Sequence, residues 1–189
     1  MPSGRAMTQT LLLSLALALP ACTHTPYWIP ESSRPLSCVP DRLPTWQDYT
    51  KQPSRTQHAG AETAMQFSII TGEHTADHRL QVRFDPRHSW VFDELVHPQN
   101  VQQWRRSQML LAHEQVHYLI SCLLVRQANY VLSIQGGNAH QMLMLVKATA
   151  QRLNTQYDAD TNHGLNVDAQ QSWIDEVLDQ FAEVSVPTR

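Results

Sequence analysis

The chain of 189 residues contains few lysines and no run of basic residues. Lys51 and Lys147 are its two lysines, and basic and acidic side chains are interspersed to give a formal net charge of −3. Proteins that bind nucleic acids usually carry a basic patch or stripe that contacts the phosphates. The composition lacks such a feature, and we expect no nucleic-acid partner.

The sequence also offers no apolar run near its start that is long enough to span a bilayer as a mature helix. The stretch from Leu11 to Leu19 has about half the required length, and it follows Arg5. This arrangement is typical of a secretory signal. The run ends in Leu19-Pro20-Ala21-Cys22, which resembles the bacterial lipobox, whose cysteine is lipidated and becomes the new N-terminus.

We therefore predict a lipoprotein-type signal peptide over residues 1–21 and lipidation of Cys22. The predicted location is the bacterial cell envelope, with a lipid anchor in the outer membrane and the protein facing the periplasm. Thr23 supports this location because an aspartate at that position would favour retention in the inner membrane. The alternative is a plain secretory signal cut near Ala21.

Cysteine is scarce, with three residues in the chain. If Cys22 carries lipid, Cys38 and Cys122 remain. The predicted compartment is oxidising, and the number of remaining cysteines is even. Both points favour a disulfide between these two residues. The alternative is a pair of unpaired buried thiols.

Glycine and proline are unevenly distributed, and they divide the chain into segments. Residues 22–44 carry five prolines and little periodicity, which predicts a tether and an extended arm. Alternating apolar residues predict strands around 63–72 and 78–86, joined as a hairpin, and a short third strand at 89–93 that is our candidate for a free edge. The remaining residues, 45–189, form the predicted functional domain.

The residues after Pro98 follow helical spacing. No glycine or proline occurs between residues 101 and 133, so one long helix is expected there, followed by helices at 139–155 and 167–184. Strands that precede helices indicate an α+β fold. We expect a small antiparallel sheet packed on the long helix, with two further helices behind it.

The motif "HEQVH", residues 113–117, lies inside the long predicted helix. Positions i and i+4 share a helix face, so His113 and His117 can direct both imidazoles at one point. This is the spacing of a zinc site in which two histidines hold Zn²⁺ and the glutamate, here Glu114, is the general base. The alternative is a glutamate hydrogen-bonded to one histidine on a solvated face.

A catalytic zinc site needs a third protein ligand. The polar cluster "YDADTNHG", residues 157–164, is the next group of candidates along the chain. We favour His163, with Asp160 as the alternative and Asp158 behind both; if Asp160 were the ligand, His163 would stabilise an oxyanion. Tyr157 is a candidate donor to the tetrahedral intermediate, although a core aromatic residue is an equal interpretation.

Several blocks together are similar to the family of exported bacterial proteins known as domain of unknown function 922, which is placed among zincin-like metallopeptidases. They are "LPTWQDYTKQPSRTQHAGAETAMQFSI", "DPRHSW", "LLAHEQVHYLI", "YDADTNHG" and "QQSW", and they span residues 40 to 180. The resemblance implies a zincin-like α+β domain, zinc at His113 and His117, Glu114 as base, and a third ligand between Asp160 and His163. Residues 116–119 read Val-His-Tyr-Leu where members often have Gly-His-Phe-Asp.

These observations favour an envelope-tethered zinc peptidase that acts on a peptide or protein. Peptidoglycan peptides are a second substrate class with the same chemistry. A non-catalytic binding or assembly lipoprotein with a structural zinc is the alternative. Four protein ligands would favour that alternative, because catalytic sites keep a position for water.

Overall fold

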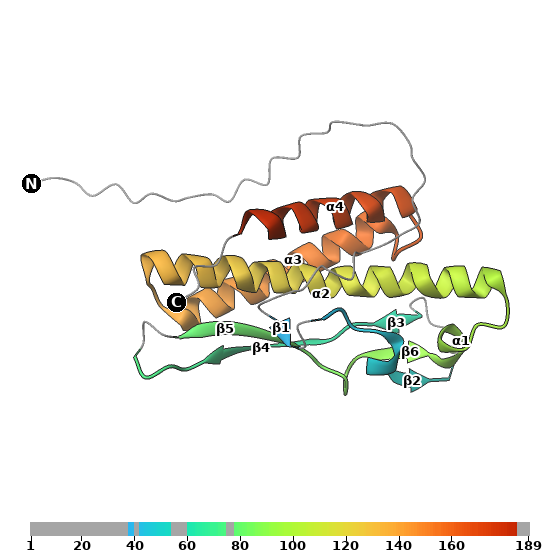
Figure 1. Ribbon diagram of the computed structural model, residues 1–189, viewed down its shortest axis with the longest axis horizontal. Helices are drawn as coiled ribbons and strands as arrows, with labels where there is room; N and C mark the ends of the chain where they lie inside the picture. Colours follow the sequence, from blue (N-terminus) through green and yellow to red (C-terminus); the bar gives the residue numbers. More distant parts are fainter. Residues whose placement is uncertain (1–37, 40–41, 54–59, 75–77, 185–189) are drawn as a thin grey trace, which may run out of the picture.

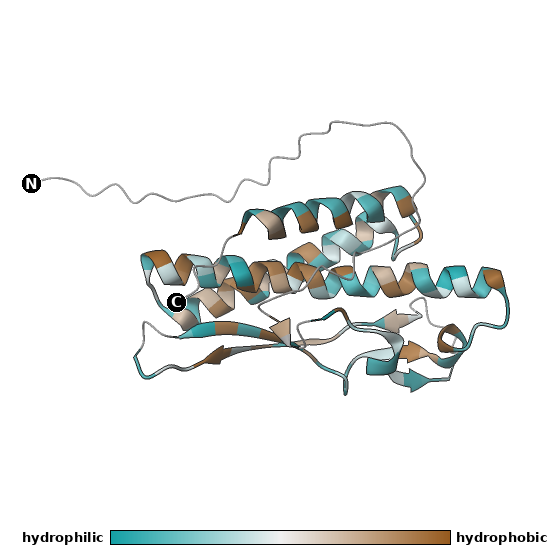
Figure 2. Ribbon diagram, in the orientation of Figure 1, coloured by the Kyte–Doolittle hydropathy of each residue, from teal (hydrophilic) through white to brown (hydrophobic). Residues whose placement is uncertain are grey.

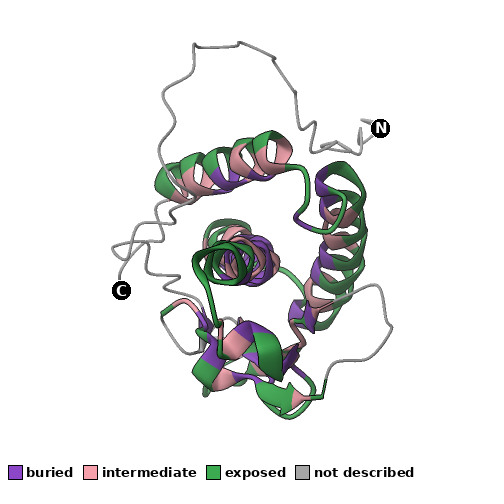
Figure 3. Ribbon diagram, turned by 90° about the vertical axis from the view of Figure 1, so that its right-hand side faces the viewer, coloured by how far each residue is buried: buried purple, intermediate pink, exposed green. Residues whose placement is uncertain are grey.

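A long helix forms the centre of the molecule, with two helices on one side and short strands on the other. The computed structural model describes residues 38–39, 42–53, 60–74 and 78–184. Viewed end-on, α2 (Val101–Gln135) is surrounded by α3 (Ala139–Thr161), α4 (Val167–Glu183) and the strands (Figures 1 and 3). The predicted α+β class, with a small sheet and a long helix followed by two more, is confirmed.

The first sheet is built on a hairpin of two six-residue strands. Strand β4 (Met65–Ile70) pairs antiparallel with β5 (Arg79–Phe84), and Leu80, Val82 and Phe84 of β5 are buried while the residues between them are not. Figure 2 shows this alternation of apolar and polar residues along β5. The apolar face packs on α2, as the two-residue period of a strand requires.

Parallel pairing replaces part of the expected antiparallel sheet. Strand β1 (Cys38–Val39) runs parallel to β5, and β2 (Thr50–Gln52) runs parallel to β6 (Trp90–Phe92), whose other neighbour is β3 (Ala61–Glu62). The prediction of one antiparallel sheet was therefore wrong, and the strands form two small mixed sheets. Strands of two or three residues are too short to show a hydrophobic period, so the sequence could not reveal their pairing.

The short strand predicted at 89–93 is present as β6, but its assignment as a free edge was wrong. Strand β6 lies between β2 and β3 and has a partner on both sides. Its residues continue directly into the short helix α1 (Asp93–Val96), while a 3₁₀ turn, η1 (Trp46–Asp48), precedes β2. Among the strands in the described part of the chain, β1, β2, β3 and β4 are each paired on one side only.

Helix α2 begins and ends where its capping residues predict. The Asn100 side chain accepts a hydrogen bond from the backbone N–H of Gln103, and the helix ends at Gly136, whose φ is 67°. Its middle turns are buried on all sides, with Val116, Tyr118 and Val125 each 0% exposed. A helix buried in this way positions its side chains rigidly.

Helix α3 is longer than the sequence predicted. It continues through the polar cluster to Thr161, whereas we expected it to stop near residue 155. Only Tyr157 and Thr161, one turn apart, are buried in this last part. The polar residues between them occupy the other faces of an amphipathic helix, so their polarity did not signal a loop.

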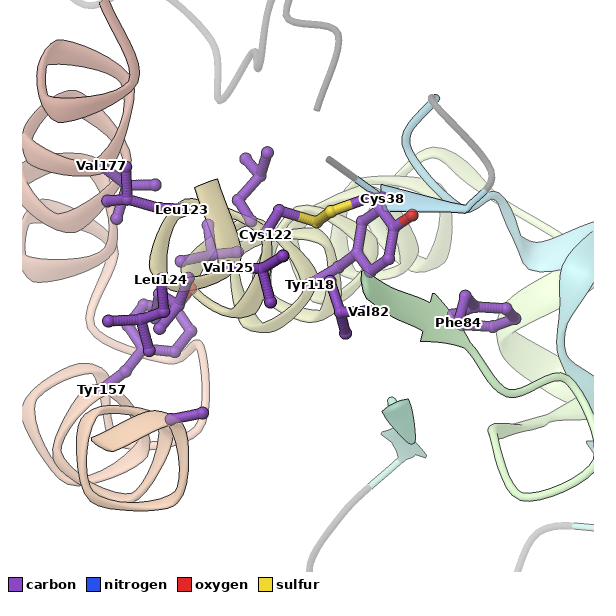
Figure 4. Packing of buried hydrophobic residues seen from close by; sticks show 14 of the residues in the cluster. Cys38, Val82, Phe84, Tyr118, Cys122, Leu123, Leu124, Val125, Tyr157 and Val177 are labelled. Carbon is purple, nitrogen blue, oxygen red and sulfur yellow. A yellow bond between two sulfur atoms is a disulfide. The ribbon is translucent and has the colours of Figure 1, made fainter. Parts of the chain in front are cut away.

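A disulfide ties β1 to the centre of α2. Cys38 and Cys122 are bonded, with their Cα atoms 5.7 Å apart, and both are buried in the core (Figure 4). This is the pair that the sequence analysis expected. The bond closes a loop across 84 residues and holds the two-residue strand β1 against β5.

We expect the double replacement Cys38→Ala and Cys122→Ala to lower the free energy of unfolding by about 2–5 kcal/mol. The physical reason is that an open chain has more conformations in the unfolded state. Urea unfolding followed by circular dichroism measures the change. Wild-type protein under a reducing agent should behave like the double variant, and equal unfolding midpoints for oxidised wild type and the variant would contradict the prediction.

The signal peptide, Cys22 and the tether up to residue 37 fall outside the described residues. Within the described part of the chain, none of the helices combines the length and the apolar character that crossing a membrane demands.

Candidate metal centre

The two histidines of α2 lie one helical turn apart and point at the same place. The Nε2 atoms of His113 and His117 are 3.2 Å apart. The His113 side chain is 3% exposed and that of His117 is 12% exposed. The helix period alone produces this convergence, because residues i and i+4 face the same direction.

Asp158 of α3 supplies the third donor atom. Its Oδ1 lies 3.1 Å from His113 Nε2 and 3.0 Å from His117 Nε2. These three residues form the one group of histidine, cysteine or acidic side chains in the described segments that could hold a metal ion. The donor set therefore differs from the one that we favoured from the sequence.

His163 and Asp160 lie outside this group. His163 Nδ1 is 3.6 Å from Asp158 Oδ1, and its side chain is 64% exposed. Asp160 Oδ2 instead accepts a hydrogen bond from Trp173 Nε1 at 3.2 Å. The physical reason is the length of α3: because the helix continues past Asp158, that carboxylate faces α2, and Asp160 is turned away toward α4.

The electrostatics of the group favour an ionised carboxylate. Partial burial would raise the pKa of Asp158, but hydrogen bonds with His113 and His117 outweigh burial and move this pKa well below its usual range. Burial alone would lower the pKa of His117, but the hydrogen bond to Asp158 and the charges of Asp158 and Glu114 outweigh burial. The pKa of His117 is therefore raised. A carboxylate that stays ionised beside two imidazoles is a ready ligand for a divalent cation.

The geometry of the three donor atoms fits a small tetrahedral ion. Tetrahedral angles and metal–ligand bonds of about 2.0–2.1 Å place donor atoms about 3.3 Å apart. The observed separations are 3.0, 3.1 and 3.2 Å. Two imidazoles and one carboxylate are also ligand types that Zn²⁺ accepts, so the residues present fit zinc with one position left for water.

Asn154 orients one of the histidines. Its Oδ1 lies 2.8 Å from His117 Nδ1 and accepts the hydrogen of this ring nitrogen, which leaves Nε2 as the nitrogen that can bind a metal ion. Sequence reasoning missed Asn154. Its position one turn before Asp158 on the same helix was the available signal, but that signal requires knowing that α3 continues to Asp158.

Glu114 is buried beside the group and keeps an unpaired oxygen. The residue is 4% exposed, and its Oε2 has no hydrogen-bond partner. Burial and the Glu114 charge both raise the pKa of Tyr49, and Thr63 Oγ1 donates to the Glu114 carbonyl at 3.4 Å. The Glu114 charge also contributes to raising the pKa values of His117 and Tyr157, so the carboxylate lies near the donor group, and an unpaired buried carboxylate oxygen in a native fold calls for a functional explanation.

Tyr157 lies behind the histidines. Its ring stacks on His113 with centroids 4.6 Å apart, meets Trp173 edge-on, and is 0% exposed. Burial raises the pKa of its phenol. This placement disagrees with the predicted role as a donor to a tetrahedral intermediate, because a phenol enclosed by α2, α3 and α4 does not reach a substrate. Tyr157 instead belongs to the hydrophobic core, where it lies near Leu124 of α2 (Figure 4).

The loop after α3 returns to the site in a strained conformation. Asn162, His163 and Gly164 have φ values of 49°, 53° and 81°. For the histidine, such a left-handed conformation costs about 1–3 kcal/mol and persists where the surroundings enforce it, commonly at functional sites. A Cβ at Gly164 would lie 3.1 Å from the His113 ring. Glycine at this position therefore allows the loop to pack closely against His113.

Comparisons with protein-family models, curated proteins and solved structures found no match to this chain.

Proposed function

We propose that the chain is a zincin-like, zinc-dependent peptidase tethered to the bacterial envelope through Cys22. The observation that carries the proposal is the convergence of three donor atoms from His113, His117 and Asp158 beside a buried glutamate with an unpaired oxygen. Bound zinc would lower the pKa of a water molecule to about 7 and polarise a carbonyl. The combination suits hydrolysis of a peptide bond.

Each residue of the site has a distinct role in this proposal. His113, His117 and Asp158 hold the ion, and Asn154 fixes the ring of His117. Glu114 accepts the proton of the attacking water and passes it to the departing amine.

His163 is the candidate for contact with the substrate. It lies on the exposed side of Asp158, and the left-handed backbone of the loop holds it there. An N–H of its ring can donate to the carbonyl oxygen as negative charge develops, which is the contribution of an oxyanion hole. This role takes the place of the one that we expected for Tyr157.

The number of donors favours catalysis over a structural zinc. Structural sites usually have four protein ligands, and three converge here within the described residues. Within the described residues, β3 and β4 each pair with one strand, and the opposite sides of these strands offer edges to which an extended peptide could add. Thr63, between these strands, donates to the backbone carbonyl of Glu114, so this segment passes next to the turn of α2 that carries the proposed base.

Metal removal tests the proposal. We expect the purified full chain to contain one zinc ion, and to cleave members of a mixed peptide library that includes peptidoglycan stem peptides. A chelator should abolish cleavage, and added Zn²⁺ should restore it. Mass spectrometry of the metal and of the peptide products provides both measurements.

Cleavage that persists after complete zinc removal would rule out the proposed mechanism, and a protein that binds iron and not zinc would overturn the metal assignment. Retained zinc without cleavage of any peptide would favour the alternative of a non-catalytic binding lipoprotein.

A further inference from the structure

His113 has a hydrogen-bonding requirement that the described contacts leave unmet. Its Nε2 faces Asp158 and His117, so a metal-binding ring must carry its proton on Nδ1. That Nδ1 is buried and has no partner. In His117, by contrast, the Nδ1 hydrogen is accepted by Asn154 Oδ1. An unpaired buried N–H destabilises the fold, and histidines that bind metals almost always donate this hydrogen.

Among the residues that the structure describes, three buried side-chain oxygens also lack a partner: Glu114 Oε2, Tyr157 Oη and Gln170 Oε1. Tyr157 stacks nearly parallel to the His113 ring, with 20° between the planes, so its hydroxyl lies out of the plane in which Nδ1–H points. Glu114 is the next residue of the helix, and neighbours at i and i+1 do not face each other. Gln170 remains.

Gln170 is placed beside the His113 ring from a different helix. It is 0% exposed, and its Nε2 donates to the carbonyl of Met109, one turn before His113, at 3.2 Å. A helical side chain covers the turn that precedes its own Cα, so the ring of His113 lies over this same turn. A Cβ at Gly164 would lie 3.1 Å from His113 Cγ and 3.2 Å from Gln170 Oε1, so both groups border the same small space.

We infer that Gln170 is a positioning residue of the metal site, whose Oε1 accepts the Nδ1 hydrogen of His113. The inference rests on the proposed zinc site. Gln170 then does for His113 what Asn154 does for His117, and α4 joins α2 and α3 in building the centre. A hydrogen bond between these two atoms would satisfy two buried groups that otherwise lack a partner among the described residues.

The zinc affinity of full-chain variants tests this inference. We expect Gln170→Met, which keeps the volume and removes the acceptor, to weaken zinc binding by about 10–100-fold. Gln170→Glu keeps an acceptor oxygen and loses the bond to Met109, so its zinc affinity should stay close to that of wild type. Competition with a fluorescent chelator of known zinc affinity measures both.

A matched control is available on the same pair of helices. Gln180 Oε1 accepts from Gln127 Nε2 between α4 and α2 at 3.3 Å, away from the site. Gln180→Met should leave the affinity unchanged, and urea unfolding of all metal-free variants separates folding from binding. Wild-type affinity in Gln170→Met, or equal losses in Gln170→Met and Gln170→Glu, would overturn the inference while the proposed function stands. Absence of zinc binding in wild type would overturn both.

Discussion

Replacing Glu114 with glutamine should remove nearly all peptide cleavage while the protein keeps its zinc. Glutamine has the same shape but cannot accept a proton from water, and general-base catalysis of this kind contributes about 10²–10⁴-fold to the rate. The residue does not belong to the donor group of His113, His117 and Asp158. We therefore expect kcat/KM to fall by that factor and the zinc content per chain to stay constant.

The control for this experiment is an exposed glutamate elsewhere. Glu94 lies on α1 and is exposed, so Glu94→Gln should leave both cleavage and zinc content unchanged. Cleavage by Glu114→Gln at the wild-type rate would remove Glu114 from the mechanism. Loss of zinc in this variant would instead mean that Glu114 belongs to the metal ligands.

Asp158→Asn should release the metal, which is the second large effect. The neutral amide loses the charge that the two histidines stabilise at 3.0 and 3.1 Å. Removing a ligand should weaken zinc binding by more than the roughly 10–100-fold expected for an outer hydrogen-bond partner. Chelator competition measures the affinity, and cleavage should be lost with the metal.

Two parallel variants distinguish Asp158 from its neighbours. Asp160→Asn retains an acceptor for Trp173 and should bind zinc normally. His163→Ala should also bind zinc but show a lower kcat, because His163 is proposed to contact the substrate and not the ion. If His163→Ala or Asp160→Asn released zinc and Asp158→Asn did not, the structural assignment of the third ligand would be wrong.

Features that depend on near neighbours in the chain could be predicted from the sequence. The period of α2 placed His113 and His117 on one face with Glu114 beside them, and the alternation in β5 defined its buried face. The predicted exported location and the number of cysteines pointed to the pairing of Cys38 with Cys122. In each case the rule is short-range or a matter of counting, so it applies before the fold is known.

The tertiary structure decided which distant groups complete the site. The choice of Asp158 over His163 depends on where α3 ends, and a polar helix end reads like a loop until Tyr157 and Thr161 are seen buried against α2 and α4. Asn154, which contacts the His117 ring, and Gln170, which we infer to accept the Nδ1 hydrogen of His113, come from separate helices. Such contacts arise from the packing of whole helices and strands, so the spacing of residues along the chain does not predict them. The short parallel strands could not be predicted for the same reason.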